Sequence, residues 1–362
     1  MDAADSTWMA QALHLAERGL LTTTPNPRVG CVLVRDGKLV GAGWHERAGE
    51  PHAEVHALRA AGEAARGATA YVTLEPCSHH GRTPPCADAL VAAGVARVVV
   101  AMLDPNPLVA GRGIEKLRAA GIAVECGLME AEARALNVGF VQRMTCGMPW
   151  VRSKIAMSLD GRTALANGVS QWITGAAARR DGHYWRARSC AVLTGIETVL
   201  HDDAQLSVRD VETSRQPLRM VLDSHLRLPL TARILQGGPV LVITASTAAG
   251  KIAELERAGA QVAVLPDECG HVDVAAALRH LAGIGCNEVL VEAGRTLNGA
   301  LLKAGLVDEL IMYLAPQLLG DMARGMAALG ELCELEQRID LEWRDVRRVG
   351  ADLRICAGIR KG

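Results

Sequence analysis

The chain has 362 residues, more than one hydrophobic core usually supports, so we expect two domains. Its formal net charge of -1 lacks the basic excess that attracts nucleic acid, and six Trp, three Tyr and one Phe leave few platforms on which bases could stack. The N-terminus has no basic segment followed by an apolar one, and no later run is long enough to cross a bilayer. We therefore expect a cytoplasmic protein without a nucleic acid or membrane partner.

The first half of the chain predicts a layered α/β domain. A helix is expected over residues 6–20, followed by a strand at 29–34 and a hairpin strand at 36–44 that opens with the favoured turn pair Asp-Gly. Helices and strands then alternate, and the segments that we assign are 52–62 (helix), 68–76 (strand), 86–94 (helix), 96–103 (strand) and 122–127 (strand). This alternation predicts a first domain over residues 1–146.

A second α/β alternation follows a linker that we expect near residues 143–150, where Gly and Pro interrupt the pattern. The predicted second domain covers residues 147–362. Its expected helices include 176–189 and 272–283, and its expected strands are 151–157, 190–195, 217–224, 239–245, 261–266, 288–294 and 308–316.

Cysteine and histidine spacing in the first half predicts a metal site. The cytosol keeps thiols reduced, so cysteines close together indicate metal binding or catalysis and not a disulfide framework. The segment HAE places Glu54 two residues after His52, and the segment EPC, which ends at Cys77, precedes Cys86. A zinc ion that activates water needs three protein ligands and one open position, which His52, Cys77 and Cys86 supply. Glu54 is then available to accept and return a proton.

The same residues match H-x-E followed by P-C, a pattern of zinc-dependent nucleobase deaminases, but a longer loop separates the two cysteines. His52 by itself could be an ordinary surface or core histidine whose ring nitrogens are hydrogen-bonded and bind no metal. A purely structural zinc site is another alternative, although it would normally use a fourth protein ligand and would not need Glu54.

Longer segments show a resemblance to a known family. PNPRVGCVLV, GAGWHERAGEPHAE and LEPCSHHGRTPPC resemble the deaminase half of the bifunctional deaminase–reductase family of riboflavin biosynthesis. SLDGRTA, SQWITG, ARRDGHYWRARS, VLHDDAQLSVR, VLDS and VEAGRTLNGALL resemble its reductase half. The resemblance implies an N-terminal cytidine-deaminase-like three-layer α/β/α domain and a C-terminal dihydrofolate-reductase-like α/β domain.

The resemblance also implies two consecutive reactions. The first is zinc-dependent hydrolytic deamination of diaminohydroxyphosphoribosylaminopyrimidine. The second is reduction of the ribosyl group of 5-amino-6-(5-phosphoribosylamino)uracil to ribityl by NADPH. The expected cofactors are therefore Zn²⁺ and NADPH, and the expected partner is a small phosphorylated pyrimidine. The apolar, aromatic-poor composition is compatible with a homo-oligomer.

Site residues follow from the resemblance, position by position. In the deaminase half the implied substrate contacts are Asn26, His45, His79 and Arg82. An Asn between prolines is also typical of a turn, and Arg82 could be a solvated loop charge. In the reductase half the implied substrate contacts are Ser170, Arg186, Leu206, Arg209 and Glu292. Two arginines suit a phosphate, since guanidinium groups match its oxygens bidentately.

The implied cofactor contacts centre on a strand, a glycine and a helix start, where backbone amides could meet a pyrophosphate. The residues are Ala156, Trp172, Thr198, Asp202, Ser224, Gly294, Arg295, Thr296, Leu297, Asn298, Gly299 and Ala300. No G-x-G-x-x-G follows a first strand, so a Rossmann dinucleotide fold is not supported. Lys154 and Asp202 are candidates for handling protons during reduction, although Lys154 could equally be an ion-paired strand residue.

Two other functions stay open at this stage. One is a tRNA or free-nucleoside deaminase with an appended reductase-like domain. The other is a zinc-stabilised nucleotide-binding or regulatory protein without turnover. Deaminase assays on free nucleosides and measurements of ammonia release distinguish them.

Overall fold

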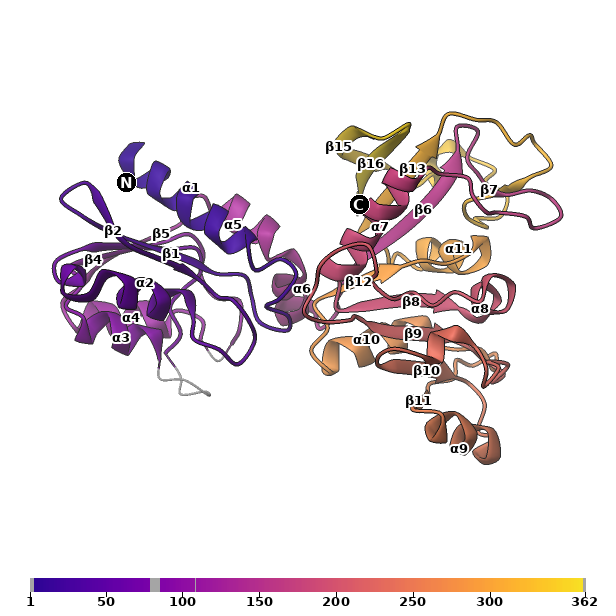
Figure 1. The fold of residues 1–362 in the computed structure, drawn as a ribbon, viewed down its shortest axis with the longest axis horizontal. Coiled ribbons are helices and arrows are strands. Elements are labelled where there is room, and N and C mark those ends of the chain that lie inside the picture. Colours follow the sequence, from indigo (N-terminus) through magenta and orange to yellow (C-terminus); the bar gives the residue numbers. More distant parts are fainter. Residues whose placement is uncertain (1–2, 79–84, 108, 361–362) are drawn as a thin grey trace. The chain divides into compact units, whose positions relative to one another are not determined.

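The structure, a computed structural model, describes residues 3–78, 85–107 and 109–360 (Figure 1). The chain divides into two compact units, Met1–Gly147 and Met148–Gly362. In the described ranges, no helix is both long enough and apolar enough to span a bilayer.

Unit 1 is built on a mixed five-stranded sheet with the order β2-β1-β3-β4-β5. Its strands are β1 (Gly30–Arg35), β2 (Lys38–Trp44), β3 (Thr69–Val72), β4 (Arg97–Val100) and β5 (Ala123–Cys126). β1 is antiparallel to both β2 and β3, whereas β3, β4 and β5 run parallel. The β1–β2 turn has Asp36 at φ 50° and Gly37 at φ 71°, the left-handed conformation that the predicted Asp-Gly hairpin requires.

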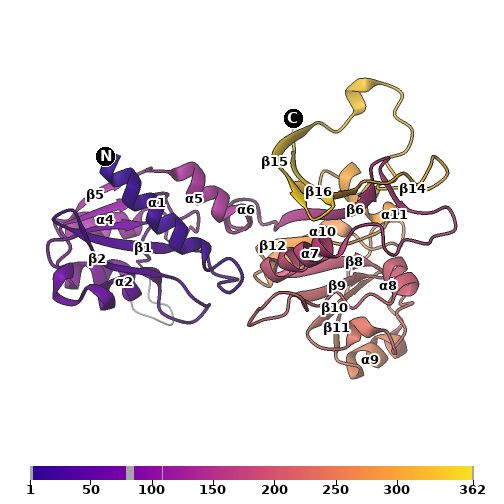
Figure 2. The same ribbon diagram turned by 45° about the horizontal axis from the view of Figure 1, so that its top comes forward.

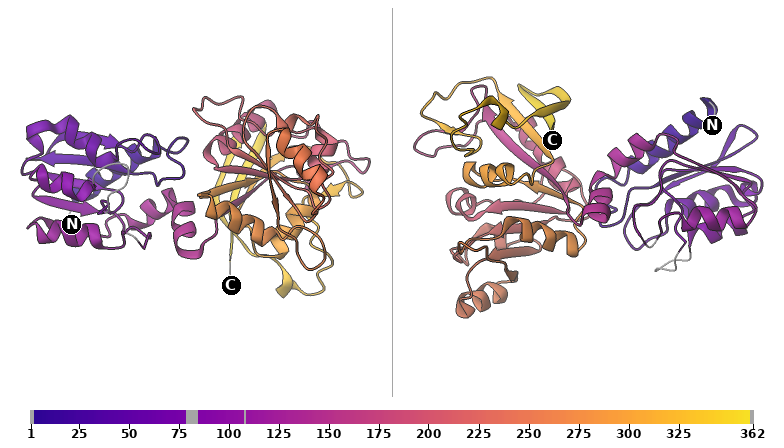
Figure 3. Two further views of the ribbon diagram at one scale, coloured as in Figure 1. Left: turned by 90° about the horizontal axis from the view of Figure 1, so that it is seen from below. Right: turned by 180° about the vertical axis from the view of Figure 1, so that it is seen from behind.

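Helices cover both faces of this sheet. They are α1 (Ala3–Glu17), α2 (Ala53–Ala61), α3 (Cys86–Ala92), α4 (Arg112–Ala119), α5 (Glu130–Leu136) and α6 (Val138–Cys146). One core joins α2, α3 and α4 to the sheet through side chains such as Ala57, Leu90 and Leu117. The opposite core joins α1, α5 and α6 through Met9 and Phe140, among others. Figure 3 (right) shows α1, in indigo, against one face. The result is the predicted three-layer α/β/α domain.

Unit 2 contains a nine-stranded sheet with the order β11-β10-β9-β8-β12-β6-β13-β16-β15. The strands are β6 (Trp150–Ser158), β8 (Ala191–Gly195), β9 (Leu218–Leu222), β10 (Val240–Thr244), β11 (Ala260–Val264), β12 (Glu288–Val291), β13 (Glu309–Ala315), β15 (Leu341–Val349) and β16 (Asp352–Ile359). The strands from β11 to β13 pair in parallel, and β16 and β15 add an antiparallel edge. Figure 2 shows β11 and α9 at one end of this sheet and β15 and β16 at the other.

Unit 2 also has a small two-stranded sheet and five α-helices among its described residues. The small sheet pairs β7 (Arg162–Ala164) with β14 (Arg324–Gly325). The helices are α7 (Ala176–Arg188), α8 (Ile196–Asp202), α9 (Ala249–Arg257), α10 (Val274–Gly283) and α11 (Arg295–Lys303). Separate apolar cores line the two faces of the large sheet, one including Leu281 and Leu301 and the other including Trp185 and Leu255.

The linker and the C-terminal edge of the large sheet differ from the sequence-based expectation. The linker was expected near residues 143–150, but α6 continues to Cys146 and β6 begins at Trp150, which leaves only residues 147–149 between them. The paired strands β15 and β16 were not predicted. β15 has the sequence LEWRDVRRV, in which charged side chains mask the alternation of a half-buried strand.

Candidate active sites

The zinc candidates of unit 1 converge from three segments. His52 lies immediately before α2, Cys86 is the first residue of α3, and Cys77 lies in the loop after β3. His52 Nδ1 is 3.2 Å from Cys86 Sγ and 3.6 Å from Cys77 Sγ. The three ligand atoms all lie within 4.8 Å of one another. An imidazole and two thiols at this spacing match the donor set of a zinc site with three protein ligands.

Local electrostatics favour a thiolate at this place. A hydrogen bond from the Cys86 thiol lowers the pKa of Cys77 below its ordinary value, with a further contribution from His52. The same bond and burial raise the pKa of Cys86 well above its ordinary value. The backbone N–H of Cys86 also donates to Cys77 Sγ at 3.3 Å. These contacts favour a thiolate at Cys77, and the thiolate is the form in which cysteine binds a metal.

Glu54 lies in the first turn of α2 and is buried. Its Oε2 atom has no hydrogen-bond partner among the described residues. Burial raises the pKa of Glu54 to about 7, while the nearby His52 acts in the opposite direction. A buried carboxylate oxygen without a hydrogen-bond partner costs free energy unless a bound ligand supplies the partner. The unpaired Oε2 atom therefore indicates that a ligand binds beside His52, Cys77 and Cys86. A pKa near neutrality suits a residue that both accepts and returns a proton.

Two of the four predicted deaminase substrate contacts lie together beside these residues. Asn26 Nδ2 is 3.0 Å from His45 Nε2, and His45 Nδ1 is 3.1 Å from the carbonyl oxygen of Pro51. The His45 and His52 rings meet edge to face, with centroids 5.2 Å apart. Because the Pro51 carbonyl can only accept, His45 Nδ1 carries the proton and Nε2 accepts from Asn26. The other two, His79 and Arg82, lie outside the described residues.

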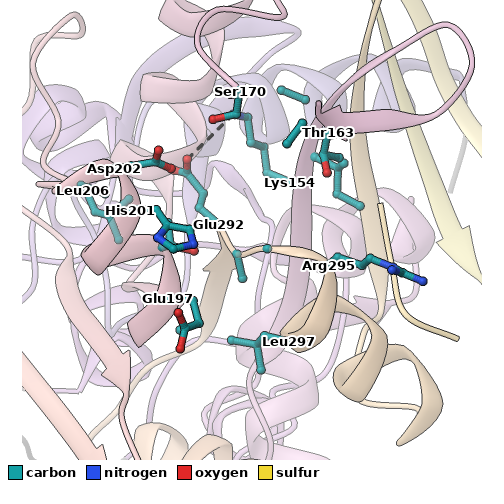
Figure 4. A pocket seen from close by; sticks show the side chains of 18 of the residues that line it. Lys154, Thr163, Ser170, Glu197, His201, Asp202, Leu206, Glu292, Arg295 and Leu297 are labelled. Carbon is teal, nitrogen blue, oxygen red and sulfur yellow. Dashed lines mark ion pairs between the residues drawn. The ribbon is translucent and has the colours of Figure 1, made fainter. Parts of the chain in front are cut away.

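Unit 2 has a cavity of about 1340 Å³. It lies at the carboxyl ends of parallel strands, where Glu292 follows β12 and Ser224 follows β9, the usual ligand position in open α/β sheets. Many of the predicted reductase residues line it: Lys154, Ala156, Ser170, Trp172, Arg186, Thr198, Asp202, Leu206, Arg209, Ser224, Glu292, Gly294, Arg295, Thr296, Leu297 and Ala300. Figure 4 shows several of these side chains around the hollow.

Asn298 and Gly299 are the predicted cofactor residues that do not line this cavity. Both are buried on the inner face of α11. Asn298 Oδ1 accepts from Ser153 Oγ at 3.1 Å, and Nδ2 donates to the carbonyl oxygen of Ala293 at 3.1 Å. A Cβ atom on Gly299 would lie 2.5 Å from the Ala328 carbonyl oxygen. These two positions hold α11 against the protein interior.

An ion-pair cluster occupies the centre of the cavity wall. Arg186 pairs with both carboxylate oxygens of Glu292, and Lys154 Nζ lies 3.8 Å from Glu292 Oε2. Burial raises the pKa of Glu292, but Arg186 and Lys154 outweigh it and bring that pKa down to about 2. Burial lowers the pKa of Lys154, against the opposing effect of Glu292. Two residues that were predicted as separate substrate contacts therefore bind each other here.

Several residues of the cavity were not predicted. His183, His201, Arg233 and Arg324 all line it. His183 lies three residues before Arg186 on α7, so helical periodicity could have placed it on the same face. Its Nδ1 is 3.3 Å from the backbone nitrogen of Arg209, and its Nε2 is 3.5 Å from Asp210 Oδ2. Arg233 and Arg324 come from distant segments, and no local pattern indicated them.

Together these features define a class of protein: a zinc-dependent deaminase domain joined to a reductase domain. Residues 2–102 match the family described as the cytidine and deoxycytidylate deaminase zinc-binding region, and residues 149–355 match the RibD C-terminal domain. The chain is 52% identical to the riboflavin biosynthesis protein RibD of Escherichia coli strain K12, over 96% of this chain and 98% of that protein. The chain belongs to the RibD family.

Solved structures agree over the full length. Acinetobacter baumannii RibD, form 1, has a TM-score of 0.92 at 49% identity, covering 99% of both chains. A Thermotoga maritima structure, described as a diaminohydroxyphosphoribosylaminopyrimidine deaminase/5-amino-6-(5-phosphoribosylamino)uracil reductase, has a TM-score of 0.88 at 33% identity, again covering 99% of both chains. The predicted fold class of both domains is confirmed.

Proposed function

We propose that this chain catalyses two consecutive steps of riboflavin biosynthesis. Unit 1 hydrolytically deaminates diaminohydroxyphosphoribosylaminopyrimidine, and unit 2 uses NADPH to reduce the ribosyl group of the resulting 5-amino-6-(5-phosphoribosylamino)uracil to ribityl. The observation that carries the proposal is the convergence of His52, Cys77 and Cys86 beside the unpaired Glu54 oxygen. The membership of the whole chain in the RibD family supports both steps.

In the first step His52, Cys77 and Cys86 would hold zinc, which supplies Lewis acidity that lowers the pKa of a water to about 7. Glu54 accepts a proton from the attacking water and delivers it to the nitrogen that leaves. The ring carbon gains an oxygen and loses its amino group as ammonia. Burial raises the pKa of Glu54 toward neutrality, which favours a carboxylate that both takes up and releases a proton.

Asn26 and His45 are proposed to orient the pyrimidine. The His45 ring is fixed by its bond to the Pro51 carbonyl, and Asn26 is fixed by His45 in turn. A pre-ordered pair of this kind lowers the entropy cost of placing the substrate beside Glu54. Asn26 retains its side-chain oxygen as an acceptor for a ring N–H or amino group.

In the second step Gly294–Leu297, Ala300 and residues such as Thr198 and Ser224 would bind NADPH, which supplies the hydride. The opened ribosyl chain accepts it at the first carbon, and a proton must reach the neighbouring nitrogen. We assign proton handling to Lys154 or Asp202, of which Lys154 is half-buried and has a pKa that desolvation lowers. Arg186 and Arg209 would meet the substrate phosphate, with Ser170, Leu206 and Glu292 completing the pocket.

The test uses the full chain and its Glu54→Gln variant. Zinc content is measured first, followed by ammonia release from the phosphorylated diaminopyrimidine and NADPH oxidation with the deaminated intermediate. We expect both proteins to retain zinc and to oxidise NADPH with the intermediate at equal rates. Ammonia release should fall about 100- to 10,000-fold in Glu54→Gln, the range for loss of a general acid–base group.

Other outcomes would favour the alternatives. Ammonia release that survives Glu54→Gln would mean that another group moves the proton. Release from free nucleosides in preference to the phosphorylated pyrimidine would identify a nucleoside deaminase. Zinc without any turnover would indicate a structural or regulatory site.

We also propose a cytoplasmic location and a homo-oligomeric assembly. All ten cysteines are free thiols, which suits a reducing compartment. Analytical ultracentrifugation of the zinc-loaded chain tests the assembly, and a single species of 38.3 kDa would contradict it.

A further inference from the structure

Glu75, two residues before Cys77, is a buried carboxylate with an unusual set of partners. It accepts four backbone N–H groups, and both of its oxygens take part. Oε1 accepts from Gly113 at 2.9 Å and Ile114 at 3.3 Å, and Oε2 accepts from Gly111 at 2.9 Å and Asp104 at 3.2 Å. These donors come from the loop after β4 and from the first turn of α4. One side chain thus ties the segment that carries Cys77 to residues 104–114.

The backbone next to Glu75 contacts the same region. The Glu75 N–H donates to the carbonyl oxygen of Met102 at 3.0 Å. The Pro76 carbonyl oxygen lies so close to Gly113 that a Cβ atom there would be only 1.9 Å away. No side chain fits in that space, and backbone atoms on both sides leave nothing that could move aside cheaply. Residues 75 and 76 are therefore held by both main-chain and side-chain contacts.

Cys77 is supported from its other side by α3. Its sulfur accepts from the Cys86 N–H at 3.3 Å, and its carbonyl oxygen accepts from the Ala87 N–H at 3.2 Å. The β3 strand ends at Val72, so the sheet no longer fixes the chain at Cys77. The position of this sulfur relative to His52 then depends on two anchors, α3 and the Glu75 contacts.

We propose that Glu75 is a positioning residue that sets the place of Cys77 in the zinc site, which rests on the zinc-dependent function proposed above. A carboxylate is required because both oxygens must accept. In Glu75→Gln one oxygen becomes an NH₂ group that faces two N–H donors, so two bonds are lost and the loop must shift. Residues that orient metal ligands without touching the metal typically change metal affinity by about 10- to 100-fold when mutated.

The experiment measures zinc release from the purified full chain to a chromogenic chelator, together with the urea midpoint of unfolding. The variants are Glu75→Gln and Gly113→Ala, which disturb the same link from opposite sides. Asp5→Asn is the matched control. Asp5 is a buried carboxylate of α1, on the opposite face of the sheet, that accepts from Tyr71 Oη at 2.8 Å and Arg97 Nη1 at 2.7 Å.

We expect Glu75→Gln and Gly113→Ala to release zinc at least about tenfold faster than the wild type. Asp5→Asn should lower the urea midpoint but release zinc at the wild-type rate. NADPH oxidation with the deaminated intermediate should be the same in all four proteins, which reports that unit 2 is intact. If Gly113→Ala does not fold, the isosteric Glu75→Gln provides the same test.

Two results would overturn the proposal. One is zinc release from the two link variants at the wild-type rate. The other is equally accelerated release from Asp5→Asn, which would mean that zinc retention follows general stability. A wild-type protein that binds no zinc would instead contradict the proposed zinc-dependent function, so the two failures are distinguishable.

Discussion

The two candidate sites are built in opposite ways. In unit 1 three ligand atoms lie within 4.8 Å of one another and come from the start of α2, the loop after β3 and the start of α3. In unit 2 residues from many strands, loops and helices surround an open cavity of about 1340 Å³. A metal needs few donors at fixed spacing, whereas a dinucleotide and a sugar phosphate need a long surface. The metal-binding residues of unit 1 therefore lie in a few short sequence motifs, whereas the ligand-binding residues of unit 2 are spread over the sequence of the whole domain.

Zinc removal should separate the two sites most sharply. A chelator should bring ammonia release down to background, because the three donors of unit 1 then have no cation to hold. NADPH oxidation with the deaminated intermediate should be unchanged, since none of the proposed reductase residues is a zinc ligand. Adding zinc back should restore ammonia release, which excludes irreversible unfolding. Loss of both activities on chelation would show that the two units depend on each other.

Breaking the Arg186–Glu292 pair should give the next largest effect. Arg186→Met leaves the half-buried Glu292 carboxylate without its main partner, and because Glu292 lines the cavity we expect a smaller loss than the about 3 to 5 kcal/mol typical of a fully buried pair. Reduction should fall strongly while deamination is retained. Arg188→Met is the matched control, because Arg188 is also on α7 and binds buried Glu288 at 3.0 Å but does not line the cavity. Equal losses of reduction in the two variants would contradict a specific role for Arg186.

The same pair predicts a pH dependence of stability. The pKa of Glu292 is about 2 in the folded chain against an ordinary 4.5. A depressed folded-state pKa contributes stability that is fully present above pH 4.5 and is lost as the pH falls toward 2, on the order of 3 kcal/mol in total. Urea unfolding of unit 2 across this range should show the loss. In Arg186→Met the decline should be smaller, since burial then raises the pKa; an unchanged decline would assign it to other groups.

His183 should give the smallest effect. His183→Ala removes the acceptor for the Arg209 N–H, a bond worth about 1 kcal/mol, so the KM for the phosphorylated substrate should rise about fivefold. His183→Asn keeps an acceptor near the Nδ1 position and should recover most of this change. Steady-state kinetics should show an unchanged KM for NADPH. Identical behaviour of the Ala and Asn variants would mean that the hydrogen bond has no role.

Much of the fold could be predicted from the sequence, because hydrophobic runs alternate regularly with helical segments. The antiparallel edge could not. β15 is mostly exposed, and its apolar residues Trp343 and Val346 face solvent among arginines. Its sequence therefore lacks the alternation of apolar and polar residues by which a half-buried strand is recognised. β15 and β16 form an antiparallel hairpin that closes at Val349 and Asp352, and the residue types of the two strands do not indicate this pairing.

The site was predictable where residue chemistry is specific. His52, Cys77 and Cys86 are metal-ligating types at a characteristic spacing, and Glu54 follows His52 at a fixed offset, so the sequence alone indicated that they lie together. The Arg186–Glu292 pair joins residues far apart in the chain, and a resemblance could mark both as pocket residues without indicating that they bind each other. The resemblance implies cofactor contacts along the whole run 294–300, but the period of α11 turns Asn298 and Gly299 inward.

Residues 147–149 join the two units covalently, and this affects the relative amounts of the two activities in the cell. Because both units belong to one polypeptide, every translated copy delivers the two activities in a fixed one-to-one ratio. Changes in gene expression cannot alter that ratio, so the steady-state level of the deaminated intermediate depends on the relative turnover numbers of the two sites. Mutations that slow only unit 2 should therefore let this intermediate accumulate, and overproduction of the whole chain should leave the balance between the two turnover capacities unchanged.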